Sequence, residues 1–304
     1  MSTAKTLLVT GATGFLGSHL VRRFVADGHT VAILKRPASS LNRIADILDR
    51  LHVFDIDCLN ELFVTLGHVD VVIHTATNYG GHSELASNIF EANTAFPLRL
   101  LEAVTRHGTG AFINTDTVLG PMLNAYALSK HQFKQWGQQF ARDGQFRFIN
   151  PRLEHMYGAG DDPTKFTTHV IRACLDNTPE LKLTLGEQKR DFIHIDDTVD
   201  AYAVVIDRLL ELDPGFSEFE VGSGHAITIR EFVETVRDLT SATTQLEFGA
   251  LPYRTNEVMF SQADTSKLHT LGWTSRFDLA AGLAKVLEGE RRLAACVNKN
   301  TENA

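Results

Sequence analysis

Short apolar runs rich in β-branched residues alternate with longer segments of helical periodicity through the first half of the chain. Segments 15–26, 84–107 and 125–142 repeat their apolar positions at the spacing of one helix face. The runs between them are LLVT at 7–10, TVAIL at 30–34, DVVIH at 70–74, AFINT at 111–115 and FRFIN at 146–150. Strands that alternate with crossover helices predict βαβ units. We therefore expect an α/β fold with a doubly wound parallel sheet.

The pattern becomes irregular after Pro151. It consists of a turn rich in Gly and Asp at 158–163, strand-like runs at 181–185 and 191–195, and a helical segment from about 196 to 212. This order predicts a second, smaller α/β lobe that is interleaved with the first domain. We place the first domain at 1–151 plus about 191–226, and the smaller lobe at about 152–190 and 227–298.

Composition excludes several classes of protein. With 304 residues, 43% of them hydrophobic, the chain can bury a large core, so a disulfide-stabilised miniprotein, a fibre and large-scale disorder do not fit. A formal net charge of −8 argues against a nucleic-acid or anionic-membrane partner. Cys58, Cys174 and Cys296 lack the spacing of a zinc site or a disulfide framework. Without a membrane-length apolar stretch or a signal-peptide pattern, we expect a cytoplasmic, metal-free protein.

A glycine-rich turn connects the first predicted strand to the first predicted helix. Gly11, Gly14 and Gly17 form a GxxGxxG pattern. Tight turning, close approach of a pyrophosphate and helix-on-strand packing each need a residue without Cβ, and the helix N-terminus offers N–H groups to an anion. The strand before the turn and the helix after it favour a Rossmann-type dinucleotide site over a plain loop.

Two cations follow the second predicted strand, where a carboxylate would bind the ribose hydroxyls of NAD. Lys35 and Arg36 would attract the 2′-phosphate of NADP, so we predict NADP(H), with NAD(H) as the alternative if the pair is only a solvated surface charge. At the end of the third strand, Asp55 and Ile56 are candidates for contact with the adenine, although Asp55 also suits a solvated turn.

A tyrosine and a lysine begin the helix that follows the fifth predicted strand. Tyr126 and Lys130 are four residues apart, so both side chains lie on one helix face. An ammonium near a phenol stabilises the phenolate, so we expect Lys130 to lower the pKa of Tyr126 into the range of a general acid or base. Thr115, at the end of the strand, would hold the substrate oxygen. This arrangement predicts hydride chemistry at a carbinol or ketone.

Segments that match the motifs of one known protein family extend over almost all of the chain. They are TGATGFLG (10–17), DVVIHTAT (70–77), Asn93 in ANTAFPLRLLEAV, INTDTVLG (113–120), YALSK (126–130), PRLEHMYGAGDD (151–162), GEQKRDFIHIDD (186–197) and ADTSKLHTLGW (263–273). Together they resemble the extended short-chain dehydrogenases/reductases that act on nucleotide-activated sugars. The resemblance implies that Tyr126 is the acid/base, that Lys130 supports it and the nicotinamide ribose, and that the smaller lobe binds the nucleotide sugar.

The resemblance also implies two sets of binding residues. The cofactor set is Gly11, Thr13, Gly14, Phe15, Leu16, Gly17, Lys35, Arg36, Asp55, Ile56, Thr75, Ala76, Thr77, Asn93, Tyr126 and Lys130. The substrate set is Asn78, Asp116, Thr117, Glu154, Lys165, Phe166, Arg190 and Arg254, with Tyr79 and His155 also near the sugar. Arg190 and Arg254 would meet the pyrophosphate, a surface salt bridge being the alternative for Arg254. His155 also suits a structural role.

The residues after Thr115 separate the possible reactions. Dehydratases of this family carry Thr-Asp-Glu, whereas this chain has Asp116 and then Thr117, so the base needed for elimination is missing. Asp116 has three open roles: a second acid, a ligand of a substrate hydroxyl, or a turn carboxylate. Epimerases of the family retain NAD and more often carry an acidic residue after the second strand, so Lys35 and Arg36 favour net reduction.

Within the family, INTDT, LEHMYGAGDDPTKFTTHVI and LTLGEQKRDFIHIDD are most similar to the group of CDP-abequose and CDP-paratose synthases. That group reduces the 4-ketone of a CDP-linked deoxysugar. Only ten residues separate Thr115 from Tyr126, fewer than is usual in the family.

The alternatives are a 4-epimerase with retained NAD(P) and a non-catalytic dinucleotide-binding protein. The resemblance also implies a homodimer formed through helix 84–107 and the Tyr126 helix.

Overall fold

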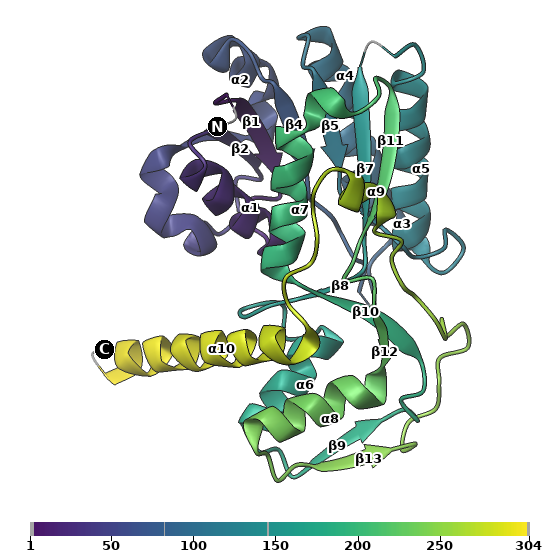
Figure 1. Ribbon diagram of the computed structural model, residues 1–304. Coiled ribbons are helices and arrows are strands. Elements are labelled where there is room, and N and C mark those ends of the chain that lie inside the picture. Colours follow the sequence, from purple (N-terminus) through teal and green to yellow (C-terminus); the bar gives the residue numbers. More distant parts are fainter. Residues whose placement is uncertain (1–2, 82, 145, 303–304) are drawn as a thin grey trace. The chain divides into compact units, whose positions relative to one another are not determined.

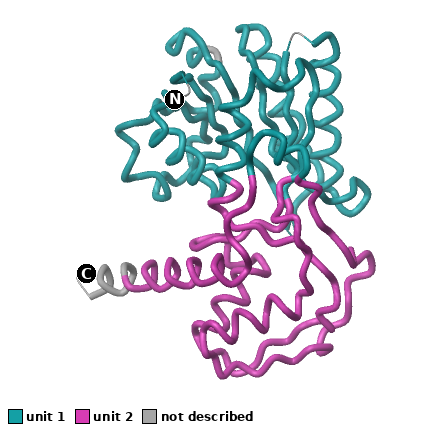
Figure 2. Tube along the Cα trace, viewed as in Figure 1, with its two compact units in different colours: residues 1–153, 199–220, 266–273 teal, residues 154–198, 221–265, 274–304 magenta. Residues whose placement is uncertain are grey.

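The computed structural model describes residues 3–81, 83–144 and 146–302. The chain divides into two compact units, shown in Figure 2. Unit 1 consists of residues 1–153, 199–220 and 266–273, and unit 2 of residues 154–198, 221–265 and 274–304. The cofactor and substrate roles expected of the two domains stay predictions.

A mainly parallel sheet forms the centre of unit 1 (Figure 1). Its strand order is β11-β7-β5-β4-β1-β2-β3, with β6 paired to β7. The strands are β1 (Thr6–Thr10), β2 (Thr30–Lys35), β3 (Leu51–Asp55), β4 (Val71–His74), β5 (Ala111–Asn114), β6 (Asp116–Thr117), β7 (Arg147–Leu153) and β11 (Phe216–Val221). Because β1 lies between β2 and β4 and pairs in parallel with both, the strand order reverses there, which is where α/β sheets bind ligands. The predicted α/β fold with a doubly wound parallel sheet is confirmed.

Helices cover both faces of this sheet. They are α1 (Phe15–Ala26), α2 (Leu59–Leu66), α3 (Ala86–Phe90), α4 (Phe96–Arg106), α5 (Ala125–Phe140), α7 (Ile195–Asp207) and α9 (Ser266–Thr270), with short η segments at Asn42–Arg50, Ile56–Cys58, Glu91–Ala95 and Leu209–Glu211. The helices α2, α4 and α5 share one apolar core with alternate strand residues such as Leu8 and Val72. An ion pair between Arg23 of α1 and Asp200 of α7 joins two other helices.

Two predicted helices differ from those observed. The expected single helix over 84–107 is interrupted, because Glu91–Ala95 forms a π-helical turn between α3 and α4. Inside this turn, Asn93 directs its buried amide to neighbouring segments, as described below. The helix expected from about 196 to 212 ends at Asp207 and is followed by a 3₁₀ turn. By contrast, α1 has the predicted bounds 15–26.

Close packing fixes α5 against the sheet. The rings of Phe112 and Phe148 stack with their centroids 5.5 Å apart, and Phe133 of α5 packs edge-on against both. A Cβ at Gly137 would lie 2.2 Å from the Phe148 ring, so only glycine lets α5 approach β7 this closely. The helix begins where the Asn124 side chain accepts a hydrogen bond from the Ala127 N–H (2.8 Å), which caps the first turn.

Unit 2 has two small sheets and its own core. A sheet of order β12-β10-β8 and a β13–β9 pair are accompanied by α6, α8 and α10. The bounds are β8 (His155–Tyr157), α6 (Phe166–Leu175), β9 (Glu180–Leu183), β10 (Lys189–His194), β12 (Ala226–Thr228), α8 (Ile229–Thr240), β13 (Gln245–Phe248) and α10 (Leu279–Glu302). Val170, Phe192 and Phe232 lie in its core. No helix among the described residues is long and apolar enough to cross a membrane.

Candidate active site

The glycine turn of unit 1 leaves no space for side chains at two of its three glycines. A Cβ at Gly11, where φ is +75°, would lie 2.5 Å from the Ala76 amide nitrogen, and a Cβ at Gly17 would lie 2.1 Å from the Gly11 carbonyl oxygen. Gly14 precedes α1 without a capping side chain, so no side-chain cap occupies the N–H groups of the first turn. The turn therefore presents bare backbone and a helix N-terminus, which suits a phosphate.

The segment after β4 is held beside this turn. Both the N–H and the hydroxyl of Thr75 donate to the Thr10 carbonyl, at 3.1 and 2.8 Å. The buried amide of Asn93 accepts from the Asn78 N–H (2.7 Å) and the Thr77 hydroxyl (3.2 Å), and donates to the Asn78 carbonyl (2.8 Å) and the Ser129 hydroxyl (3.0 Å). Asn93 thus uses its amide to clamp the loop and α5, and its predicted contact with cofactor would have to compete with these bonds.

The two cations after β2 have different surroundings. Lys35 forms an ion pair with Asp55, Nζ to Oδ1 being 2.6 Å, so two of the predicted cofactor residues meet each other. The Arg36 side chain is exposed, and no hydrogen bond or ion pair with another described residue holds it. The positive charge of Lys35 is therefore already matched, and Arg36 is the cation of this pair that is available to a phosphate.

Thr115 directly follows β5. Its N–H donates to the His74 carbonyl (3.0 Å), which ties its backbone to the end of β4. Its hydroxyl lies 2.7 Å from the hydroxyl of Tyr202, on α7. Sequence reasoning missed Tyr202, since a tyrosine among the apolar positions of a helix has the pattern of a core residue.

Tyr126 and Lys130 lie on the first turns of α5. Lys130 is only 2% exposed and makes no hydrogen bond or ion pair within the described part of the chain. Burial lowers the pKa of Lys130 to about 8, and the negative charge of Asp116 acts in the opposite sense. Burial raises the pKa of Tyr126, with smaller contributions from Tyr79 and Asp116, while a hydrogen bond from Thr117 partly offsets the shift.

The sequence-based prediction for the Tyr126 pKa is wrong for the protein alone. We expected Lys130 to lower it, but the pKa is raised. Removing a phenolate from water raises the pKa of Tyr126, and the charges of Tyr79 and Asp116 act in the same direction, so the hydrogen bond from Thr117 only partly offsets the shift. Spacing along a helix places two side chains on one face but does not reveal how deeply they are buried.

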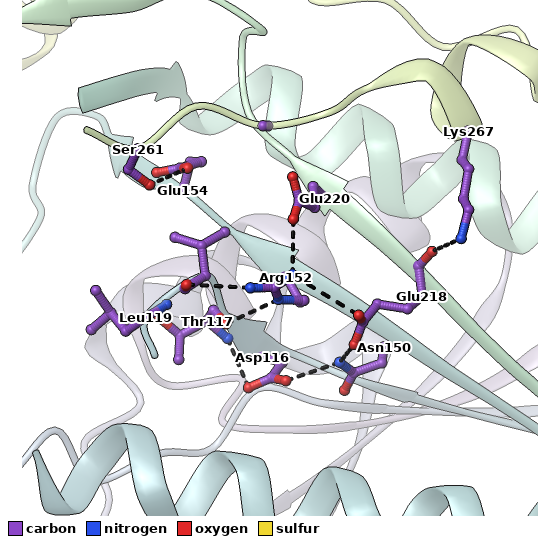
Figure 3. Close-up of polar contacts among 12 residues, drawn as sticks. Asp116, Thr117, Leu119, Asn150, Arg152, Glu154, Glu218, Glu220, Ser261 and Lys267 are labelled. Carbon is purple, nitrogen blue, oxygen red and sulfur yellow. Dashed lines mark hydrogen bonds and ion pairs between the residues drawn. The ribbon is translucent and has the colours of Figure 1, made fainter. Parts of the chain in front are cut away.

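Asp116 is held in a buried polar network (Figure 3). Its Oδ1 accepts from the Thr117 N–H (2.8 Å) and its Oδ2 from the Asn150 amide (2.9 Å). The same amide nitrogen donates to Glu218 Oε2 (2.8 Å), and Asn150 Oδ1 accepts from the Asn114 amide (2.8 Å). One asparagine therefore bridges two carboxylates, and Asp116 has a fixed orientation. Its role as a second acid, as a ligand of a substrate hydroxyl or as a turn carboxylate stays a prediction.

The Glu218 carboxylate also meets cations. Lys134 lies 3.2 Å and Arg152 3.9 Å from its oxygens, and Arg152 forms a closer pair with Glu220 (2.8 Å). Nothing in the sequence pattern distinguished these groups, because Lys134, Arg152 and Glu218 come from three elements that are distant along the chain.

The remaining predicted substrate residues lie in unit 2. The buried Glu154 carboxylate accepts from the Ser261 hydroxyl (2.5 Å) and lies 3.2 Å from His155 Nδ1. The buried Arg190 pairs with Glu257 (2.6 Å); burial lowers the Arg190 pKa, and Glu257 partly offsets this.

Lys165, Phe166 and Arg254 complete this set. Lys165 pairs with Asp161 (3.0 Å), and Phe166 begins α6 with its ring partly exposed. Arg254 is exposed and forms no ion pair with any described residue, and its role at the pyrophosphate stays a prediction. Lys165 and Arg190 are thus paired with carboxylates, and Arg254 is the cation of this set that is not in an ion pair with a described residue.

The model of the NAD dependent epimerase/dehydratase family matches residues 7–222. CDP-abequose synthase of Salmonella muenchen is 32% identical over 290 residues, which cover 93% of this chain and 97% of that protein. GDP-L-fucose synthase 1 of Arabidopsis thaliana is 24% identical, covering 93% and 92%.

Two solved structures share the architecture. MoeE5 in complex with UDP-glucose and NAD is 26% identical, with a TM-score of 0.79 over 95% of this chain and 99% of that one. UDP-glucose 4-epimerase of Thermotoga maritima with UDP-glucose is 21% identical, with a TM-score of 0.83 and the same coverage, and this likeness concerns the fold alone.

Proposed function

Because the chain belongs to the NAD dependent epimerase/dehydratase family, we propose that it is an NADPH-dependent reductase of the 4-keto group of a nucleotide-linked deoxysugar. The nucleotide we expect is CDP, since CDP-abequose synthase is similar over nearly the whole chain. The observation that carries the choice of reaction is at the end of β5. There Thr115 and Asp116 lie by the Tyr126 and Lys130 helix, and the chain has Thr117 where the resemblance implies that dehydratases carry a glutamate base.

The residues of unit 1 fit a nicotinamide dinucleotide. The Gly11–Gly17 turn forms a cradle that a Cβ would fill, and Lys130 buries an ammonium that no described residue pairs. The turn and Arg36 would hold the phosphates, and Lys130 would hold ribose hydroxyls. When bound, the reduced nicotinamide supplies a hydride.

The protein's own groups manage the proton and the keto oxygen. Thr115 would hold the C4 oxygen by a hydrogen bond, and Tyr126 would donate a proton to it. Because burial raises the pKa of Tyr126, the phenol is protonated at neutral pH, which suits a proton donor. Lys130 would then stabilise the phenolate that remains, until a proton from solvent restores the phenol.

The preference for NADPH rests chiefly on Arg36. Its exposed guanidinium can bind a 2′-phosphate, whereas Lys35 is paired with Asp55. Replacing Arg36 with Gln should reduce the ratio of kcat/KM for NADPH to that for NADH by about 10- to 100-fold, the equivalent of one charge-assisted hydrogen bond. Lys35→Met is the matched control and should change the ratio less. An unchanged ratio in Arg36→Gln would contradict the assignment.

The proposed reaction is tested by cofactor consumption. Purified protein is mixed with NADPH or NADH and a CDP-linked 4-keto-3,6-dideoxy sugar, with dTDP- and GDP-linked 4-keto sugars as controls. We expect loss of NADPH absorbance with the CDP-linked sugar. The 4-epimerase is tested in a separate sample that contains a CDP-linked 4-hydroxy sugar, and inversion of its C4 without a net change in cofactor absorbance would establish it. No change in sugar or cofactor would contradict both reactions.

We also propose a homodimer formed through α3 and α5. Phe90 of α3 and Leu128 and Trp136 of α5 are exposed apolar side chains on two helices that contact each other. Light scattering should give twice the 33.7 kDa mass of one chain, and Trp136→Glu should favour the monomer. A monomeric wild-type protein at micromolar concentration would contradict this proposal.

A further inference from the structure

Tyr202 buries a phenol against the hydroxyl expected to hold the substrate. Its side chain is 2% exposed, and its oxygen lies 2.7 Å from Thr115 Oγ1. A buried phenol needs a hydrogen-bond partner, because an unpaired one costs about 1–3 kcal/mol. Within the described residues, Thr115 is the hydrogen-bond partner of Tyr202, and Tyr202 is that of the Thr115 hydroxyl. The two hydroxyl groups therefore determine each other's orientation.

The chemistry of the two groups favours one direction for this hydrogen bond. A phenol is a stronger acid than an aliphatic alcohol, and its oxygen is a weaker acceptor, because its lone pair is delocalised into the ring. Burial also raises the pKa of Tyr202, so its O–H stays protonated. Tyr202 then donates to Thr115 Oγ1, and the hydrogen of Thr115 is left to point elsewhere.

We propose that Tyr202 is a positioning residue that donates to Thr115 and so directs the Thr115 O–H toward the keto oxygen of the substrate. This inference rests on the proposed function, in which a carbonyl reacts beside Thr115 and Tyr126. The Thr115 backbone is anchored by its N–H to His74, so the Tyr202 bond fixes the remaining freedom, which is the rotation of the hydroxyl. A hydroxyl that accepts one hydrogen bond also becomes a better donor in the next.

A double-mutant cycle on turnover tests the proposal. Tyr202→Phe keeps the ring and removes the O–H, and Thr115→Val removes the hydroxyl at nearly constant shape. We expect Tyr202→Phe to lower kcat about three- to tenfold with little change in KM for NADPH, since one hydrogen bond to the substrate oxygen is weakened. In the Thr115→Val background, the same substitution should cause no further loss.

The control separates positioning from a general loss of packing. Tyr157→Phe removes another buried phenol oxygen, in the core of unit 2, and should leave kcat within twofold of wild type. If Tyr202→Phe lowers kcat by the same factor in both backgrounds, or does not lower it at all, the proposal is wrong.

Urea unfolding of wild type, Tyr202→Phe, Thr115→Val and the double variant tests the contact between the two hydroxyl groups without any substrate. The two substitutions should be less than additive in their effect on the free energy of unfolding, because each leaves the other hydroxyl unpaired. Additive effects would overturn the inference. Failure of the proposed function would give a different result: no NADPH oxidation by wild type, with the coupling in urea intact.

Discussion

Two regions of unit 1 that we propose as parts of the cofactor site differ in their construction. The glycine turn at 11–17 depends on close backbone packing, because a Cβ added at Gly11 or Gly17 would collide with a peptide group. The cluster of Thr115, Tyr126 and Lys130 consists of buried polar groups, and burial raises the pKa of Tyr126 and lowers that of Lys130, which favours the neutral form of each. The first region should not tolerate a Cβ at Gly11 or Gly17, and the second should lose function when one of its polar groups is removed.

The largest effect should follow removal of one oxygen from the polar cluster. Tyr126→Phe keeps the ring but takes away the proton donor, so we expect kcat to fall by about 10²- to 10⁴-fold. The dissociation constant for NADPH, measured by fluorescence titration, should stay within threefold of wild type. Tyr253→Phe, which alters a phenol in unit 2, provides a control with near-normal turnover. More than one-tenth of wild-type kcat in Tyr126→Phe would exclude Tyr126 as the donor.

Two glycines with similar φ, Gly11 and Gly67, test whether close backbone packing limits the glycine turn. Gly11 and Gly67 have φ of +75° and +71°, but a Cβ at Gly11 meets the Ala76 amide nitrogen at 2.5 Å, whereas a Cβ at Gly67 meets nothing within 4 Å. Gly67→Ala should cost about 1–3 kcal/mol, because its backbone (φ +71°, ψ −57°) is strained for a residue with a side chain. Gly11→Ala should cost about 3 kcal/mol or more, or prevent folding, and should abolish NADPH binding if it folds. Equal losses in urea unfolding would refute the close approach.

Replacing Lys130 should have a smaller effect, and it should increase the free energy of unfolding rather than decrease it. Its pKa is lowered from 10.5 to about 8 in the folded protein, so below pH 8 the buried ammonium costs stability. Between pH 8 and 10.5 the unfolded chain binds more protons, and the stability of wild type should rise relative to a variant without the amine. Lys130→Met should therefore be more stable by on the order of 1–3 kcal/mol at pH 7 without cofactor, though inactive.

The pH dependence provides the check for Lys130. In urea unfolding at pH 7 and pH 10, the advantage of Lys130→Met should shrink at the higher pH. A variant less stable than wild type at pH 7 would show that the ammonium is satisfied in the folded state.

The sequence was sufficient for the features that repeat locally. Apolar runs predicted the strands, and the GxxGxxG pattern predicted a turn in which Gly11 needs a positive φ. The helix expected at 84–107 was wrong in its middle, because the π turn at Glu91–Ala95 accompanies the bonds that Asn93 makes to Asn78 and Ser129. These hydrogen bonds join residues that are distant along the chain, so the periodicity of the sequence does not predict them.

The sequence pattern was most informative where candidate residues share one element. Tyr126 and Lys130 are one helical turn apart, and the structure places both on α5, while their catalytic roles stay predictions. Tyr202, Asn150 and Glu218 reach the end of β5 from α7, β7 and β11, and they were missed because no local pattern relates them to Thr115 or Asp116. The direction of the Tyr126 pKa shift was missed for the same reason, since burial is a property of the folded chain.

Net reduction is tested most directly by following the hydride. The protein is supplied with NADPH that carries deuterium at the transferable position of the nicotinamide, together with a CDP-linked 4-keto sugar, and the product is examined by mass spectrometry and NMR. The account predicts one deuterium at C4 of the product sugar for each NADP⁺ formed. A 4-keto sugar that is recovered without deuterium at C4, with no NADP⁺ formed, would contradict net reduction.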